Sequence, residues 1–161
     1  MSDRLLSIYL NDHLAGLTAG VELAERCRGN NPGEPLRTLL TEVRDGFDRE
    51  RDQVRELLQR LDASEDPVKQ GAAWVAEKFG RLKANGALVG YSDLSRVLEL
   101  EALIVLAEGS YMLWESLAQR HFHDPRRAPL DLTVLQASAG QRLEKLRVQH
   151  RVAVARAFVG D

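Results

Sequence analysis

Residues 35–61 read PLRTLLTEVRDGFDRERDQVRELLQRL, and the spacing of their apolar residues decides the fold class. These residues recur at alternating steps of three and four, which is the period of an α-helix with one buried face. Pro35 suits the first turn of a helix, where its missing N–H is not needed. One charged residue, Glu50, interrupts the apolar face. The apolar positions are Leu36, Leu40, Val43, Phe47, Val54, Leu57 and Leu61.

Other segments with a helical pattern cover about residues 2–28, 67–84, 92–121 and 131–158. All five prolines lie at segment edges, as expected because a proline inside a helix costs about 3 kcal/mol. The period-two alternation of strands is absent. Glycines inside the segments, such as Gly20, Gly46 and Gly109, mark either close helix approach or neutral surface positions. The sequence predicts an all-α protein, and its 161 residues favour one domain spanning residues 1–161.

The links between the helices predict their arrangement. The turn at 29–33 is short, which suits antiparallel neighbours. About thirty residues, including the short helix expected at 67–84, separate the second long helix from the third. That link can run the length of a helix of about 40 Å. We therefore expect a four-helix bundle with a long crossover between its second and third long helices, and a short extra helix within the crossover.

Segment 92–121 is apolar on nearly all sides, and a helix of this kind is buried by more than one neighbour. The bundle core covers only one of its sides. The rest must contact the crossover helix, whose apolar face includes Trp74 and Phe79, or a second copy of the chain. We therefore expect a homodimer formed through this helix or through the crossover helix.

The composition excludes several function classes. The 22 basic and 24 acidic residues give a net charge of −2, without the basic excess expected for binding nucleic acid or an anionic membrane. A single cysteine, Cys27, excludes an intrachain disulfide and multi-cysteine metal sites. No stretch reaches the ~18 apolar residues of a membrane span, and no secretory signal is evident, so we expect a cytoplasmic protein. The last helix has a basic side that could contact an acidic partner: Arg142, Lys145, Arg151 and Arg156.

Several polar residues interrupt the apolar faces of the expected helices. Glu50 is followed three residues later by Gln53, and Arg147 precedes His150 by three residues. A three-residue step places both members of a pair on one face of a helix. His13 lies beside the apolar face of the first helix. Three glutamates follow one stripe of segment 92–121, and we expect one or two of them to point inward: Glu101, Glu108 and Glu115.

The helix order, the crossover and these partial motifs resemble the ferritin-like superfamily over nearly the whole chain. In its di-iron members, two helices each supply a Glu and two each supply a Glu-x-x-His pair. The resemblance implies a metal centre used for iron oxidation or oxygen activation. The sequence departs from that pattern twice: Gln53 stands where a histidine is needed, and Arg147 stands where a carboxylate is needed.

Two interpretations of these residues remain open. In the first, Glu50, Glu108 and Arg147 form a buried network of ion pairs and hydrogen bonds in place of a metal. A buried charge without a partner is costly, so the carboxylates should be matched by Arg147, His150 or His13. No cofactor is then expected. The second is a metal site, since carboxylate and imidazole suit iron or manganese, although a guanidinium that stays protonated would repel the ion. Its ligands would be His13, Glu50, Glu108 and His150, with Glu101 in reserve.

Each interpretation predicts a different function. The first predicts a non-catalytic ferritin-like bundle that acts as a structural or regulatory interaction protein, with its di-iron site lost. The second predicts a metal-binding oxidoreductase or a metal carrier. The first is favoured because both Glu-x-x-His motifs are incomplete.

Overall fold

The computed structural model of the chain describes residues 3–65, 90–118 and 130–159, which are helical apart from short connections. The four helices are α1 (Asp3–Asn30), α2 (Leu36–Arg60), α4 (Asp93–Ala118) and α5 (Leu132–Phe158), and no strand occurs within these ranges. The predictions of an all-α protein and of its four long helices are confirmed. The short helix expected at 67–84 lies outside the described residues.

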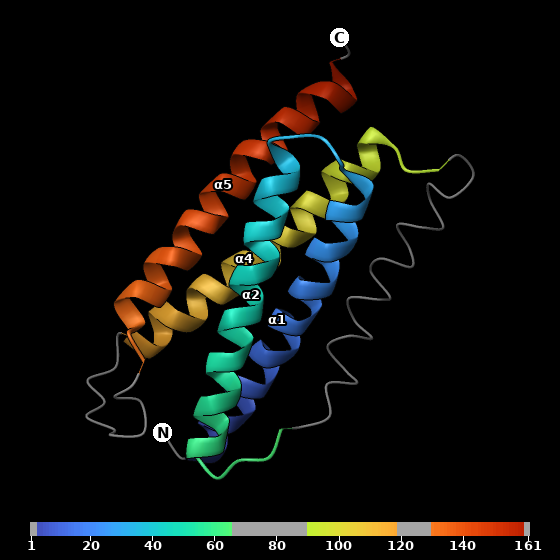
Figure 1. Ribbon diagram of the computed structural model, residues 1–161. Helices are drawn as coiled ribbons and strands as arrows, with labels where there is room; N and C mark the ends of the chain where they lie inside the picture. Colours follow the sequence, from blue (N-terminus) through green and yellow to red (C-terminus); the bar gives the residue numbers. More distant parts are fainter. Residues whose placement is uncertain (1–2, 66–89, 119–129, 160–161) are drawn as a thin grey trace.

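The helices form a bundle of two antiparallel pairs (Figure 1). α1 packs along α2, and α4 packs along α5; α1 also contacts α4, and α2 contacts α5 least extensively of the four pairs. In the first half of α1, Asn11 Nδ2 donates to the carbonyl of Ser64 at 3.3 Å. Just after α1, Asn31 Nδ2 donates to the hydroxyl of Tyr91 at 2.7 Å. The end of α2 and the start of α4 therefore lie at opposite ends of the bundle, and these two helices point the same way (Figure 1).

The helices begin at residues whose side chains satisfy free N–H groups, as expected at helix N-termini. The Ser92 hydroxyl accepts from the N–H of Ser95 at 3.1 Å, and the Asp131 carboxylate accepts from the N–H of Val134 at 3.0 Å. At the start of α2, Glu34 Oε2 accepts from the N–H of Thr38 at 3.1 Å. Ser92 and Asp131 therefore cap the N-termini of α4 and α5.

The core is built from the apolar faces that the sequence indicated, with two charged side chains among them. Its largest fully buried side chains are Trp114 and Phe47, surrounded by leucines and valines from all four helices. Glu50 and Arg142 are buried within the same layer of the bundle. The next largest fully buried side chains are Leu10, Leu14, Leu40, Leu57, Leu58, Leu100, Leu103, Leu113, Leu146 and Val43.

Two glycines lie where a side chain from another helix approaches the backbone closely. A Cβ atom on Gly20 would lie 2.8 Å from Cδ2 of Phe47, and a Cβ atom on Gly46 would overlap the guanidinium of Arg142. Close approach, one of the two explanations for the helix glycines, is therefore confirmed at both positions. At Gly109 the other explanation holds within the described ranges, where a Cβ atom would have no neighbour within 4 Å.

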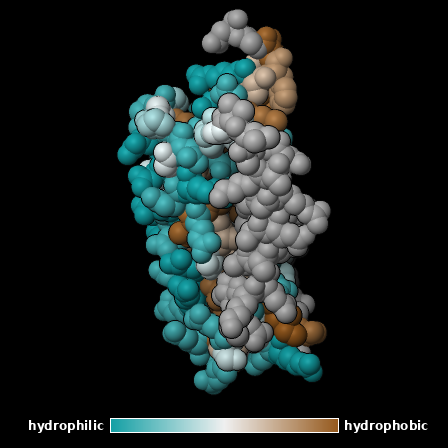
Figure 2. Space-filling model, turned by 90° about the vertical axis from the view of Figure 1, so that its right-hand side faces the viewer, coloured by the Kyte–Doolittle hydropathy of each residue, from teal (hydrophilic) through white to brown (hydrophobic). Residues whose placement is uncertain are grey.

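The outer face of α4 carries exposed apolar residues together with the exposed Glu101. Leu94, Val105 and Met112 lie on one side of the helix, since they are 11 and 7 residues apart, and Val105 is 62% exposed. On the face shown in Figure 2, the coloured surface is largely hydrophilic, with hydrophobic residues at the upper end and at the lower right edge. None of the described helices combines the length and the apolar character that a membrane span requires.

Candidate functional site

The centre of the bundle holds a buried cluster of Glu50 from α2, Ser110 from α4 and Arg142 from α5. Arg142 Nη2 donates to both carboxylate oxygens of Glu50, at 2.8 and 2.7 Å, and lies 2.9 Å from Ser110 Oγ. The Ser110 hydroxyl donates to Glu50 Oε2. The side chains of Glu50 and Arg142 are 3% and 7% exposed. The carboxylate predicted to interrupt the core is thus buried, and its charge is matched by a guanidinium.

The surroundings of Arg142 explain how the core accepts its guanidinium. The group lies 4.8 Å from the ring centroid of Phe47, which provides an attractive π-face for a cation. Gly46 leaves the space that the group occupies next to α2. Arg142 Nε is a buried donor with no partner among the described residues. An unpaired buried donor costs free energy. The cluster therefore pairs the two charges but leaves one donor of Arg142 unsatisfied.

The prediction that Arg147 neutralises Glu50 is wrong, because Arg142 occupies that position. Arg147 lies at the surface, 42% exposed, where its terminal nitrogens bind Glu108 at 3.0 Å and Glu144 at 2.6 Å. Glu108 is itself 45% exposed. The physical reason is the helical phase of α5, which turns position 142 toward α2 and position 147 toward solvent.

The other residues proposed as ligands are distributed over the bundle. His150 Nε2 lies 3.1 Å from Glu101 Oε1, at a partly exposed position between α4 and α5. His13 contacts Tyr9 in α1, with ring centroids 4.5 Å apart. Within the described ranges, no three His, Cys, Asp or Glu side chains gather where they could hold a metal ion. The structure therefore does not bring the proposed ligand set together: His13, Glu50, Glu108 and His150.

The glutamates of α4 also differ from expectation. Glu101 is exposed, and Glu108 and Glu115 are only partly buried, so the expected inward stripe is wrong. The acidic residue that α4 buries is Glu99, which is 6% exposed. In α4, Ser110 is the polar residue that reaches the central cluster.

His13 gives the bundle a pH dependence of known sign. Burial lowers the pKa of His13 below its usual value of 6.5, and the neighbouring Asp12 carboxylate opposes this only in part. The unfolded chain therefore binds the proton more readily, and stability is lost as the pH falls through about 6.5. We expect the Tm of the wild type to fall more between about pH 8 and pH 5 than that of His13→Asn. Circular dichroism melts would measure both, and an equal or smaller fall in the wild type would contradict this assignment.

A second polar cluster ties the end of α1 to the start of α4. Glu99 accepts from Arg26 Nε at 3.0 Å and from the Tyr91 hydroxyl at 3.0 Å. Asn31, which is 4% exposed, donates to Tyr91 at 2.7 Å and accepts from Arg96 Nε at 2.5 Å. The chain of hydrogen bonds therefore runs from Arg96 through buried groups to Glu99.

Cys27 lies beneath this second cluster as an unreactive thiol. Its Sγ is 3.6 Å from Asn31 Nδ2, and its side chain is fully buried. Burial, reinforced by the Glu99 carboxylate, raises the pKa of the thiol to about 12. Since the thiolate is the nucleophilic form, Cys27 serves as a packing residue.

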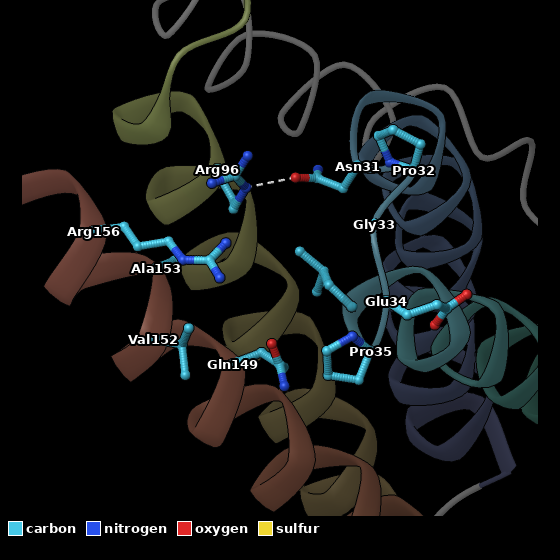
Figure 3. Close-up of a pocket in the computed structure, with 11 residues that line it drawn as sticks. Asn31, Pro32, Gly33, Glu34, Pro35, Arg96, Gln149, Val152, Ala153 and Arg156 are labelled. Atoms are coloured by element: carbon cyan, nitrogen blue, oxygen red, sulfur yellow. Dashed lines mark hydrogen bonds between the residues drawn. The ribbon is translucent and has the colours of Figure 1, made fainter. Parts of the chain in front are cut away.

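A pocket of about 220 Å³ opens beside the second cluster, between the α1–α2 connection and the last turns of α5 (Figure 3). Arg96 reaches it from α4, and Arg156 and Gln149 reach it from α5. Its remaining lining consists of Asn31, Pro32, Gly33, Glu34, Pro35, Leu36, Val152 and Ala153.

Sequence reasoning missed the roles of Arg142 and Glu99, and for Arg142 a signal was present. Arg142 lies three residues after Ala139 and four before Leu146, which places it on their buried face. It had been predicted to belong to an exposed basic side with Lys145, which does lie at the surface, bound to Glu42 at 2.7 Å. No protein-family model matches the sequence, and no curated protein or solved structure is significantly similar to the chain.

Proposed function

We propose that this chain is a non-catalytic helical bundle with ferritin-like connectivity, which acts as a structural or regulatory interaction protein. The observation that carries the proposal is the buried cluster of Glu50, Ser110 and Arg142. Both oxygens of the one fully buried carboxylate in α2 are bound by a guanidinium, which does not release its proton in proteins. The parallel directions of α2 and α4 support the ferritin-like connectivity, because their link has to cross from one end of the bundle to the other.

The donor set at the centre does not fit a di-iron centre. A carboxylate-bridged pair of ions needs several carboxylates and imidazoles at one point, whereas Glu50 has Arg142 and Ser110 as neighbours. A metal ion there would have to displace Arg142 and would then lie beside its positive charge. Glu108 and His150 are held in separate contacts toward the surface.

The interaction surface in this proposal is the outer face of α4, and the partner is a second copy of the chain. Leu94, Val105 and Met112 form an apolar stripe along this face. A helix face that packs on the same face of its copy forms a self-complementary, two-fold interface. Burying such a stripe removes apolar surface from water, at about 25 cal/mol per Å².

Metal content tests the first half of the proposal. The full chain is expressed with added iron and manganese and purified without chelators, and its metal is measured by mass spectrometry. We expect less than stoichiometric metal, unchanged in Glu108→Ala and His150→Ala, which alter partly exposed residues. Stoichiometric iron or manganese in the wild type would overturn the proposal, and its loss in either variant would indicate the metal-binding alternative.

Sedimentation equilibrium tests the second half. We expect the wild type to form a dimer and Val105→Lys to be monomeric, because the substitution places a charge in the proposed interface. Val134→Lys is the matched control: Val134 is 56% exposed on α5, outside the stripe, and the variant should remain dimeric. A wild type that is monomeric at all concentrations, or a dimer that Val105→Lys leaves intact, would reject the interface.

A further inference from the structure

We propose that the pocket beside α5 binds a small organic anion, with a carboxylate or phosphate head between Arg96 and Arg156 and a short apolar body against Val152. The proposal concerns the end of the bundle and does not depend on the function proposed above. Three observations support it: the pocket has an excess of hydrogen-bond donors, hydrogen bonds fix the guanidinium of Arg96 in place, and part of the pocket wall is apolar.

The pocket is rich in donors. Arg156 has no hydrogen-bond partner among the described residues, and neither does the side chain of Gln149, which also faces the pocket (Figure 3). Arg96 binds other residues through Nε and Nη1, so its Nη2 is left without a partner among the described residues. Donors that converge without protein acceptors are matched best by an anion, whose oxygens accept several charged hydrogen bonds.

The guanidinium of Arg96 is held in place before any ligand arrives. Its Nε donates to Asn31 Oδ1 at 2.5 Å, and its Nη1 donates to Asp93 Oδ1 at 2.6 Å. Asn31 is in turn fixed by donation to the Cys27 carbonyl at 2.7 Å and to the Tyr91 hydroxyl. A held side chain loses little conformational entropy on binding, which increases affinity.

The acidic groups nearby do not neutralise the positive charge that Arg96 and Arg156 bring to the pocket. Glu34 lines the pocket, but its carboxylate binds the N–H of Thr38 and points away from the two arginines (Figure 3). Asp93 binds Arg96 without lining the pocket. Arg156, which is exposed, keeps its positive charge unpaired within the described part of the chain.

The remaining walls set the size and character of the ligand. Pro32, Pro35, Val152 and Ala153 supply the apolar part of the lining. The volume of about 220 Å³ is below the ~300–1,000 Å³ typical of pockets for drug-sized ligands. The geometry therefore suits a short-chain carboxylate or alkyl phosphate.

Calorimetric titration of the full chain tests the proposal with four probes: hexanoate, hexyl phosphate, inorganic phosphate and hexanol. We expect saturable one-to-one binding of at least one anion with a hexyl chain, at least about tenfold tighter than hexanol, because charged hydrogen bonds are strong. Hexanoate and hexyl phosphate distinguish the two head groups. If inorganic phosphate bound as tightly as hexyl phosphate, the hexyl chain would contribute nothing to the affinity, and the proposed apolar part of the ligand would be wrong.

Variants assign the binding to this pocket. Arg156→Gln should lower the affinity for the anion about tenfold or more. The fold of this variant should be unaffected, because Arg156 is exposed. Arg151→Gln removes an exposed cation from the same helix outside the pocket and should leave the affinity unchanged. Absence of saturable binding by every anion, or equal affinity in wild type and Arg156→Gln, would overturn the proposal.

Discussion

Arg142→Met should destabilise the bundle by about 3–5 kcal/mol, because it leaves the carboxylate of Glu50 buried without its positive partner. Of the present partners, only the Ser110 hydroxyl would then remain hydrogen-bonded to the Glu50 carboxylate. Since 1 kcal/mol shifts the Tm of a domain of this size by about 2–4 °C, the melting temperature should fall by roughly 10 °C or more. Urea unfolding of the wild type and the variant measures the difference directly.

The same substitution at Arg147 is the matched control. Arg147 lies on the same helix as Arg142 and forms a half-exposed pair with Glu108 of α4, and such pairs contribute about 0–1 kcal/mol. The double variant Glu50→Met/Arg142→Met should recover most of the stability, because replacing a buried pair by apolar side chains is often neutral or stabilising. A loss at Arg142 no larger than that at Arg147 would contradict the central role of the Glu50–Arg142 pair.

Gly46→Ala should also destabilise the bundle, by about 1–3 kcal/mol, although alanine is the better helix former. The added Cβ atom would overlap the Arg142 guanidinium, which would have to move away from Glu50. The change therefore weakens the ion pair without altering either charge. Thermal and urea unfolding of the purified variant provide the measurement.

Gly109→Ala is the control for Gly46→Ala. Both glycines lie inside helices, but a Cβ atom at position 109 would have no neighbour within 4 Å among the residues that the structure describes. Alanine there should stabilise the protein by up to ~1 kcal/mol through helix propensity. Two substitutions of the same kind should thus change the free energy of unfolding in opposite directions. A stabilising Gly46→Ala would show that the Arg142 guanidinium can move aside without losing its contact with Glu50.

The helices could be predicted from the sequence because proline placement and the three-to-four period are local signals. Residues 35–61 predicted α2, which spans Leu36–Arg60, and the burial of Glu50 followed from its position between Phe47 and Val54. The direction of α4 relative to α2 followed from the length of their link. These features depend on one helix or one connection at a time.

The partner of Glu50 could not be predicted in the same way, because it depends on the rotation of α5 about its own axis. Arg142 and Arg147 are both charged and five residues apart, and the resemblance to the Glu-x-x-His pattern drew attention to Arg147. The apolar residues Ala139 and Leu146 favoured Arg142, but long basic side chains are usually exposed. Likewise, the apolar residues around α4 gave no clear buried face. Glu99 was therefore missed, and one or two of the three glutamates Glu101, Glu108 and Glu115 were expected to point inward.

The pairing of Glu50 with Arg142 also fixes how far α5 can slide along α2. These two helices contact each other less extensively than α1 and α2, α4 and α5, or α1 and α4 do, and leucines and valines alone would fit several alignments. A shift by one helical turn, about 5.4 Å, would leave a carboxylate and a guanidinium facing hydrocarbon. One pair of opposite charges therefore selects a single axial register for the two helices.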